Sequence, residues 1–198
     1  LEDRVRQLSN DIDTQFSPAI TLLEIAPCSR VGEDGLLNVI KGQASADYWY
    51  EGVGNYVQAI SRFSDRFIDE LLSLAKLNTI FYVDLSHFSS FLCGISDRML
   101  NGQIALTTHE NENVKAHAIE GLVDYCTLGR AAKAVKGRVS RVLVQAFKDD
   151  SSRVRASAVY GLQNWELDEF LKPLIDDIKA LLTDSDRQVQ YTTATTLV

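Results

Sequence analysis

Apolar residues recur through most of this chain at intervals of three and four, the spacing that gathers side chains on one face of an α-helix. The first such run of the chain consists of Leu1, Val5, Leu8, Ile12 and Phe16. A second run covers residues 48–74 and predicts one long helix or two, and a third covers residues 85–95 and predicts another helix. The pattern predicts an all-α fold without a β-sheet.

Two stretches in the first half interrupt this helical pattern. Ser17-Pro18 is expected to break the first apolar run, because proline lacks the N–H that an internal helical turn uses. Residues 26–46 contain one proline and three glycines, so they predict loops with one short helix at residues 36–40.

Three segments of the second half align with one another without gaps. Their apolar faces begin at Val114, Val154 and Val189, and the separations of 40 and 35 residues fit a repeat of two helices and two turns. A polar turn precedes each segment, and its Asn, Asp and Ser side chains can cap the helix that follows. Another apolar helix precedes each turn in the last two copies.

The middle segment, residues 154–162, reads Val-Arg-x-x-Ala-x-x-x-Leu, a pattern that resembles the second helix of a HEAT repeat. Lys115 takes the arginine position in the first segment, whereas Gln190 and Thr193 replace the arginine and the alanine in the third. The resemblance covers residues 97–198. It implies an α-solenoid of antiparallel helical hairpins, that is, a HEAT-like superhelix.

The resemblance also implies how the repeats are joined and how the chain is divided. Asp149 or Asp150, together with Arg155, would tie neighbouring repeats together. Residues 97–198 are expected to be HEAT-like repeats, and residues 1–96 an N-terminal helical region of divergent helical pairs or a capping bundle. The chain begins without methionine and stops within an apparent helix, so we expect a longer polypeptide in which the repeats continue.

Composition is typical of a soluble globular protein, with 45% hydrophobic and 24% charged residues. No run approaches the roughly 18 to 20 apolar residues that span a bilayer, so no membrane partner is expected. Cys28, Cys93 and Cys126 are odd in number and far apart, which predicts core thiols in a reducing, cytoplasmic compartment instead of a disulfide framework.

Residue types that carry catalysis or bind metals form no recognisable constellation. The 3 histidines are His87, His109 and His117, and neither His-Glu-x-x-His nor Cys-x-x-Cys occurs. Glycine-rich phosphate loops and a Gly-x-Ser-x-Gly elbow are absent from the sequence as well. We therefore expect no enzyme activity, no metal and no cofactor. An enzyme accessory or lyase, as in the HEAT-like bilin lyase group, is the second alternative.

Charge is distributed unevenly along the chain. There are 20 basic and 27 acidic residues, a net charge of −7, yet residues 130–155 carry +6 and the other 172 residues therefore −13. The basic patch predicted from this stretch consists of Arg130, Lys133, Lys136, Arg138 and Arg141. A phosphate-bearing or acidic partner could bind there, so nucleic-acid binding, as in DNA-binding HEAT-like proteins, is the first alternative function. The overall acidity opposes it.

The preferred interpretation is a non-catalytic interaction scaffold that presents a curved helical surface to a protein partner. Stacked second helices align residues at equal offsets, and these are predicted to face solvent and to contact the partner. They are Asn113, His117, Glu120 and Asp124 in the first repeat, Arg153, Ser157, Tyr160 and Asn164 in the second, and Gln188, Thr192 and Thr195 in the third. Tyr160 and Arg153 are the predicted anchors, because aromatic and arginine side chains dominate binding hot spots.

Overall fold

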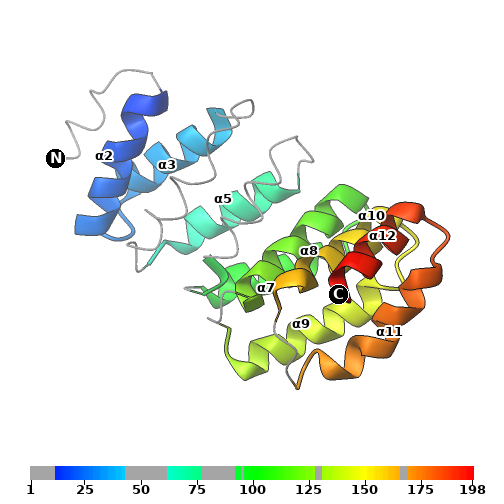
Figure 1. Ribbon diagram of the computed structural model, residues 1–198. Coiled ribbons are helices and arrows are strands. Elements are labelled where there is room, and N and C mark those ends of the chain that lie inside the picture. The colour runs from blue at the N-terminus through cyan, green and yellow to red at the C-terminus, as the bar shows by residue number, and fades with distance from the viewer. Residues whose placement is uncertain (1–11, 43–61, 77–91, 95, 128–130, 166–168) are drawn as a thin grey trace. The chain divides into compact units, whose positions relative to one another are not determined.

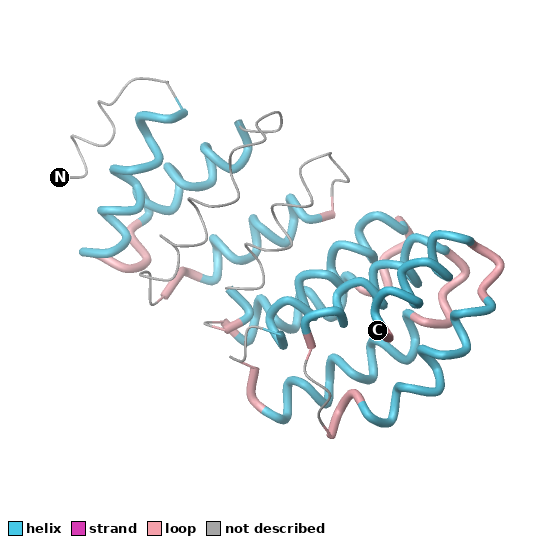
Figure 2. The backbone as a smooth tube through the Cα atoms, viewed as in Figure 1, coloured by secondary structure: helices cyan, strands magenta, loops and turns pink. Residues whose placement is uncertain are grey.

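The computed structural model describes residues 12–42, 62–76, 92–94, 96–127, 131–165 and 169–198. These residues form helices and connecting turns, and no strand occurs among them, which confirms the predicted all-α fold (Figure 2). The chain divides into two compact units, Leu1–Asp84 and Leu85–Val198. The helices expected within residues 1–11, 48–61 and 85–91 lie outside the described residues, and a domain boundary between residues 96 and 97 stays a prediction.

In the first unit, α2 (Ile12–Ile25) and α3 (Arg30–Gly42) form an antiparallel hairpin, and α5 (Asp65–Ala75) packs against α3 (Figure 1). Each helix contributes large apolar side chains to a common core. Those that are fully buried include Leu23, Leu36, Leu37, Phe67 and Leu71. Burial of each such side chain contributes roughly 1.5 to 3 kcal/mol to folding.

Two sequence predictions for this hairpin are wrong. Helix α2 continues through Pro18, since burial of the apolar side chains beyond it offsets the roughly 3 kcal/mol that an internal proline costs. The stretch predicted as loops forms most of the 13-residue helix α3. Its glycines are contact points: a Cβ on Gly32 would lie 2.8 Å from Leu23 Cγ, and one on Gly35 would lie 3.0 Å from Ala19 Cβ. They allow the two helices to approach closely.

A buried carboxylate fixes the start of α5. Glu33 is 1% exposed and accepts hydrogen bonds from the backbone N–H of Ser64 at 2.6 Å and from its hydroxyl at 2.5 Å. Ser64 in turn caps α5 by accepting the N–H of Phe67 at 3.2 Å. Arg66 donates to Glu33 at 3.2 Å and forms an ion pair with Asp34 at 2.8 Å. Because this carboxylate is paired and hydrogen-bonded, the protein tolerates its burial.

The second unit consists, over its described residues, of three helical hairpins (Figure 1). Helices α8, α10 and α12 lie side by side in one layer, and α7, α9 and α11 form the other. The first two hairpins are α7 (Asp97–Leu106) with α8 (Glu112–Thr127), and α9 (Lys133–Ala146) with α10 (Ser152–Tyr160) and the short helix η1 (Gly161–Asn164). The third comprises η2 (Lys172–Leu174), α11 (Ile175–Ala180), η3 (Leu181–Thr183) and α12 (Arg187–Thr196).

Side chains in the polar turns fix where the second helices begin. Asn111 Oδ1 accepts the N–H of Asn113 at 2.9 Å before α8, and Asp186 Oδ1 accepts the N–H of Gln188 at 2.7 Å before α12. Before α10, Asp149 Oδ1 closes the turn by accepting the backbone N–H two residues ahead at 2.9 Å. The bonds before α8 and α12 satisfy helix N–H groups that have no partner within the helix, as the sequence predicted, whereas α10 begins without a side-chain cap.

The aligned apolar positions are buried in the first two hairpins, whereas in the third the first of them is buried and the last, Leu197, is 37% exposed. Val114, Val154 and Val189 are 1%, 1% and 0% exposed, and Leu162 is 3% exposed. Thr193, which replaces the alanine of the pattern, is also buried, and its hydroxyl donates to the carbonyl oxygen of Val189 at 2.7 Å. That hydrogen bond satisfies the extra oxygen, so a threonine fits a position that is otherwise apolar.

Charged side chains on the second helices connect each hairpin to the next. Lys115 Nζ lies 2.6 Å from Asp149 Oδ2, and Arg155 donates two hydrogen bonds of 2.8 and 2.7 Å to the carboxylate of Asp184. Arg155 also donates to the backbone carbonyl of Asp149 at 2.8 Å, which holds its own turn. Gln190, at the equivalent position, makes the same kind of bond to the carbonyl of Asp184. We call the pairs Lys115–Asp149 and Arg155–Asp184 the inter-repeat ladder.

Gly161 is expected to be a tight contact between α8 and the end of α10. A Cβ there would lie 2.8 Å from Val123 Cγ1 and 2.9 Å from Val123 Cβ, so Gly161→Ala should lower the free energy of unfolding by about 1 to 3 kcal/mol. Gly137→Ala in α9 is the matched control, because its nearest neighbour, Phe170 Cε1, is 3.4 Å away. Denaturant unfolding measures both, and equal midpoints would contradict the close packing at Gly161.

Candidate functional site

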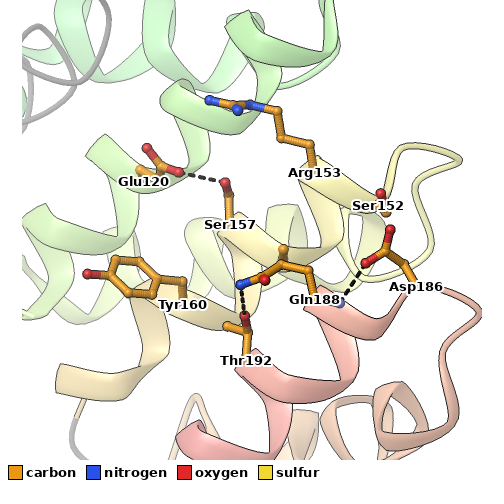
Figure 3. A pocket seen from close by; sticks show the side chains of 9 residues that line it. Glu120, Ser152, Arg153, Ser157, Tyr160, Asp186, Gln188 and Thr192 are labelled. Atoms are coloured by element: carbon orange, nitrogen blue, oxygen red, sulfur yellow. Dashed lines mark hydrogen bonds between the residues drawn. The ribbon is translucent and has the colours of Figure 1, made fainter.

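A groove of about 420 Å³ opens across the layer of second helices (Figure 3). Its walls come from α8, α10 and α12 and from the residues at the start of the last two helices. It is lined by Glu120, Ser152, Arg153, Ala156, Ser157, Tyr160, Asp186, Gln188 and Thr192. The structure therefore brings six of the eleven predicted partner-contacting residues together in one concave surface, namely Glu120, Arg153, Ser157, Tyr160, Gln188 and Thr192.

A row of hydrogen bonds links α8 to α10 along the groove. Arg153 Nη2 donates to His117 Nε2 at 3.3 Å, and His117 Nδ1 lies 3.1 Å from Glu120 Oε2. Nε2 therefore faces a donor and Nδ1 faces a carboxylate oxygen, so the ring bridges Arg153 and Glu120. Ser157 Oγ donates to the other oxygen, Glu120 Oε1, at 2.5 Å. Both carboxylate oxygens are thus held in place.

The prediction that the whole stripe faces solvent is wrong for its middle positions. His117, Ser157 and Thr192 are only 7%, 8% and 5% exposed. The reason is lateral stacking: residues at equal offsets on adjacent helices meet in the seam between those helices and cover one another. Sequence alignment identifies the shared offset but does not say whether it lies over a seam.

The other stripe residues differ in how far they reach the surface. Arg153 and Tyr160 are exposed, and Tyr160 retains 61% of its surface, as predicted for the two anchors. Asn113, Glu120 and Asp124 are half-buried. In the third hairpin Gln188 and Thr195 are exposed. Asn164 ends η1, and its side chain is not among those described.

The electrostatics of the groove favour a permanently charged Glu120. Burial opposes its ionisation, but hydrogen bonds from His117 and Ser157 and the positive charge of Arg153 outweigh burial and lower the pKa of Glu120 below its ordinary value. The side chain is 24% exposed, so the charge remains accessible from the groove. Glu120 therefore carries a negative charge throughout the neutral pH range.

Asp186 supplies a second negative charge to the groove, and the sequence did not single it out as a site residue. Its carboxylate caps α12 through the N–H groups of Gln188 and Val189 at 2.7 and 3.4 Å. The bond from the Gln188 N–H, followed by the one from the Ser152 hydroxyl, lowers the pKa of Asp186. The polar turn predicted a helix cap, and the groove position of that cap follows only from the packing of α10 beside α12.

The predicted basic patch lies on α9, in the other layer from the groove, and the structure pairs most of its described members. Lys133 forms an ion pair with Glu169 at 2.8 Å, and Lys136 lies 5.7 Å from the ring centre of Trp165. Arg138 donates to Asn101 at 2.6 Å. Arg141 is exposed on the same helix, and Arg130 lies outside the described residues. These cations are therefore spread among local partners along α9.

The described residues contain no metal-binding cluster and no membrane-spanning helix. No three histidine, cysteine or carboxylate side chains within them come together as metal ligands. Cys93 and Cys126 are buried, and burial, with a smaller effect of Cys126, raises the pKa of Cys93, which makes that thiol unreactive. No described helix combines the length and apolarity needed to cross a membrane.

No protein-family model matches the chain, and no curated protein matches its sequence. Among solved structures, a designed armadillo repeat protein in complex with the peptide (KR)4 matches 99% of this chain and 85% of its own, with a TM-score of 0.55 and 16% identity. The chain has the fold of a helical repeat solenoid. Computationally designed armadillo repeat proteins for modular peptide recognition also match, with 14% identity, a TM-score of 0.46, and 98% and 85% of the two chains covered.

Proposed function

We propose that the chain is a non-catalytic interaction scaffold and that the groove on its second helices binds an extended segment of a protein partner. The observation that carries the proposal is Tyr160, which keeps 61% of its surface exposed inside a groove lined by hydrogen-bonded polar side chains. Tyrosine is among the residues that dominate binding hot spots. Covering this large apolar ring with a partner would remove its surface from water and so contribute favourable binding free energy.

The dimensions and rigidity of the groove favour a peptide segment over a folded domain. A volume of about 420 Å³ is in the range of pockets that hold small ligands or a few residues of extended chain. Ser157 and His117 hold Glu120 by hydrogen bonds, and Gln188 Nε2 donates to Thr192 Oγ1 at 3.4 Å. Because these side chains are already ordered, they lose little conformational entropy when a peptide binds. The (KR)4 complex of the similarly folded designed protein supports a peptide partner at the level of fold.

We further propose that residues 97–198 form a repeat domain of the HEAT type. Support comes from the two-helix repeat, from valines spaced by 40 and 35 residues, and from the inter-repeat ladder of Lys115–Asp149 and Arg155–Asp184. The ladder residues occupy the arginine position of the pattern and the turn of the following repeat, which is where the resemblance implies them. This arrangement keeps the second helices in register and so maintains the groove.

The groove residues are expected to carry the binding energy. Peptides enriched from a displayed random library on the immobilised chain would serve as ligands, with dissociation constants measured by fluorescence anisotropy. Arg153→Ala combined with Tyr160→Ala should weaken binding by more than about 2 kcal/mol, roughly 30-fold. Both side chains are exposed, so thermal unfolding should change little.

Matched variants separate this proposal from its main alternative. Arg141→Ala combined with Tyr191→Ala removes the same two residue types from exposed positions that do not line the groove, and should leave binding unchanged. If Lys133→Glu with Lys136→Glu abolishes binding while the groove variant does not, the basic patch is the site. A steep loss of affinity for duplex DNA as salt rises would then favour the nucleic-acid alternative. A library without any enriched peptide would contradict the peptide proposal.

A further inference from the structure

We infer that Tyr160 and Glu120 form a seat for a positively charged side chain, so that the groove selects an extended peptide containing lysine or arginine. The inference deepens the proposed function and rests on it. It concerns the chemistry of the partner, whereas the proposed function concerns the location and type of the site. Three features of the second unit lead to it: the register of α10 on α8, the sign of the accessible charges, and the exposed ring.

The register between α8 and α10 positions the Tyr160 ring near the Glu120 carboxylate. Arg153 contacts His117, 36 residues earlier, Ser157 contacts Glu120, 37 residues earlier, and Gly161 faces Val123, 38 residues earlier. Tyr160 falls between the second and third of these contacts, which puts it opposite the turn of α8 that runs from Glu120 to Asp124. In Figure 3 Tyr160 and Glu120 both lie at the edge of α10 that faces α8.

The charges within reach of this ring are negative. Glu120 stays ionised because hydrogen bonds and the charge of Arg153 lower its pKa despite burial. Asp186 contributes another carboxylate from the α12 side of the groove. Among the described residues that line the groove, Arg153 is the one cation; it lies about two helical turns from Tyr160 along α10, and its guanidinium is bonded to His117. A cationic ligand group therefore meets attraction at the Tyr160 end.

A cationic side chain also matches the aromatic ring. A lysine ammonium or arginine guanidinium over a tyrosine face gains cation–π energy, and the aliphatic stem of either residue covers apolar ring surface. A carboxylate or phosphate at the same place would face Glu120 and lose hydration without a counter-charge. Because the whole chain carries a net charge of −7, its field also accelerates the approach of a basic segment.

The test compares three octapeptides binding to the 198-residue chain: four Lys-Arg pairs, four Glu-Asp pairs, and four Ser-Asn pairs. Dissociation constants are measured by fluorescence anisotropy at low and at physiological salt. The Lys-Arg peptide should bind, and the other two should not. Glu120→Gln should weaken its binding about tenfold, and Tyr160→Leu, which keeps an apolar side chain but removes the aromatic face, by about fivefold.

A matched charge control guards against nonspecific attraction to an acidic protein. Asp176→Asn removes one exposed carboxylate from α11, outside the groove, and should leave the affinity unchanged. Equal losses for Asp176→Asn and Glu120→Gln would overturn the inference, as would a failure of the Lys-Arg peptide to bind. In either case, the proposed function is retained if the Arg153→Ala, Tyr160→Ala double variant still lowers the affinity for a library-selected peptide. If that affinity is unchanged, the proposed function is wrong as well.

Discussion

Replacing Arg155 by alanine is expected to lower the free energy of unfolding of the second unit by about 3 to 5 kcal/mol. Arg155 makes two hydrogen bonds of 2.7 and 2.8 Å to Asp184, whose side chain is 7% exposed, and another to the carbonyl of Asp149. Without the guanidinium, the Asp184 carboxylate is left in a largely buried position without its main donor. The loss of that bond, more than of the Coulomb attraction, sets the size of the effect.

Acid unfolding gives this prediction a second readout. The hydrogen bonds from Arg155 lower the pKa of Asp184 below its ordinary value, so ionised Asp184 stabilises the native state above about pH 4. That stabilisation disappears as the pH falls through the lowered native pKa. The free energy of unfolding of wild type should therefore drop between pH 5 and pH 2 more steeply than that of Arg155→Ala. Arg141→Ala, an exposed arginine on α9, should match wild type in both measurements. If the unfolding free energies of wild type and Arg155→Ala depended on pH in the same way, the stabilising role of the Arg155–Asp184 pair would be contradicted.

Leu162→Ala is expected to cost about 2 to 5 kcal/mol. Leu162 occupies the last apolar position of the repeat pattern and is 3% exposed in η1, directly after the close contact of Gly161 with Val123. Removing three carbon atoms there leaves a cavity that the stacked helices on either side cannot fill without shifting. Denaturant unfolding followed by circular dichroism measures the change.

Leu182→Ala provides the control for that substitution. Leu182 lies in η3 of the next hairpin and keeps 42% of its surface exposed, so its truncation should change the unfolding free energy by less than about 1 kcal/mol. Similar costs for the two leucines would show that Leu162 is not part of the core.

The repeat architecture could be predicted from the sequence because its main signal is local. The valines at 114, 154 and 189 recur on one helical face, and all three are buried in the structure. The resemblance alone led to the expectation that Arg155 and Asp149 join neighbouring repeats, and both residues are part of the inter-repeat ladder. In each case, a property of one helix or one turn is enough for the prediction.

The errors have a common cause, which is packing between helices. Gly32 and Gly35 were interpreted as loop residues, since the sequence does not show that Leu23 and Ala19 lie against them. His117 and Ser157 were predicted to face solvent because the seam between α8 and α10 depends on how the two helices stack. Asp186 was missed as a groove residue for the same reason. Two glycines spaced three residues apart in an otherwise helical pattern, as Gly32 and Gly35 are, could have indicated that two helices pack closely.

Mapping a bound peptide by nuclear magnetic resonance tests the central claim most directly. A library-selected peptide is titrated into the isotopically labelled chain, and the shift of each assigned signal is followed. We predict the largest changes at Glu120, Ser157, Tyr160 and Thr192, with signals of α9 such as Arg141 nearly unmoved. Largest changes on α9, with the groove signals unaffected, would contradict the assignment of binding to the second helices.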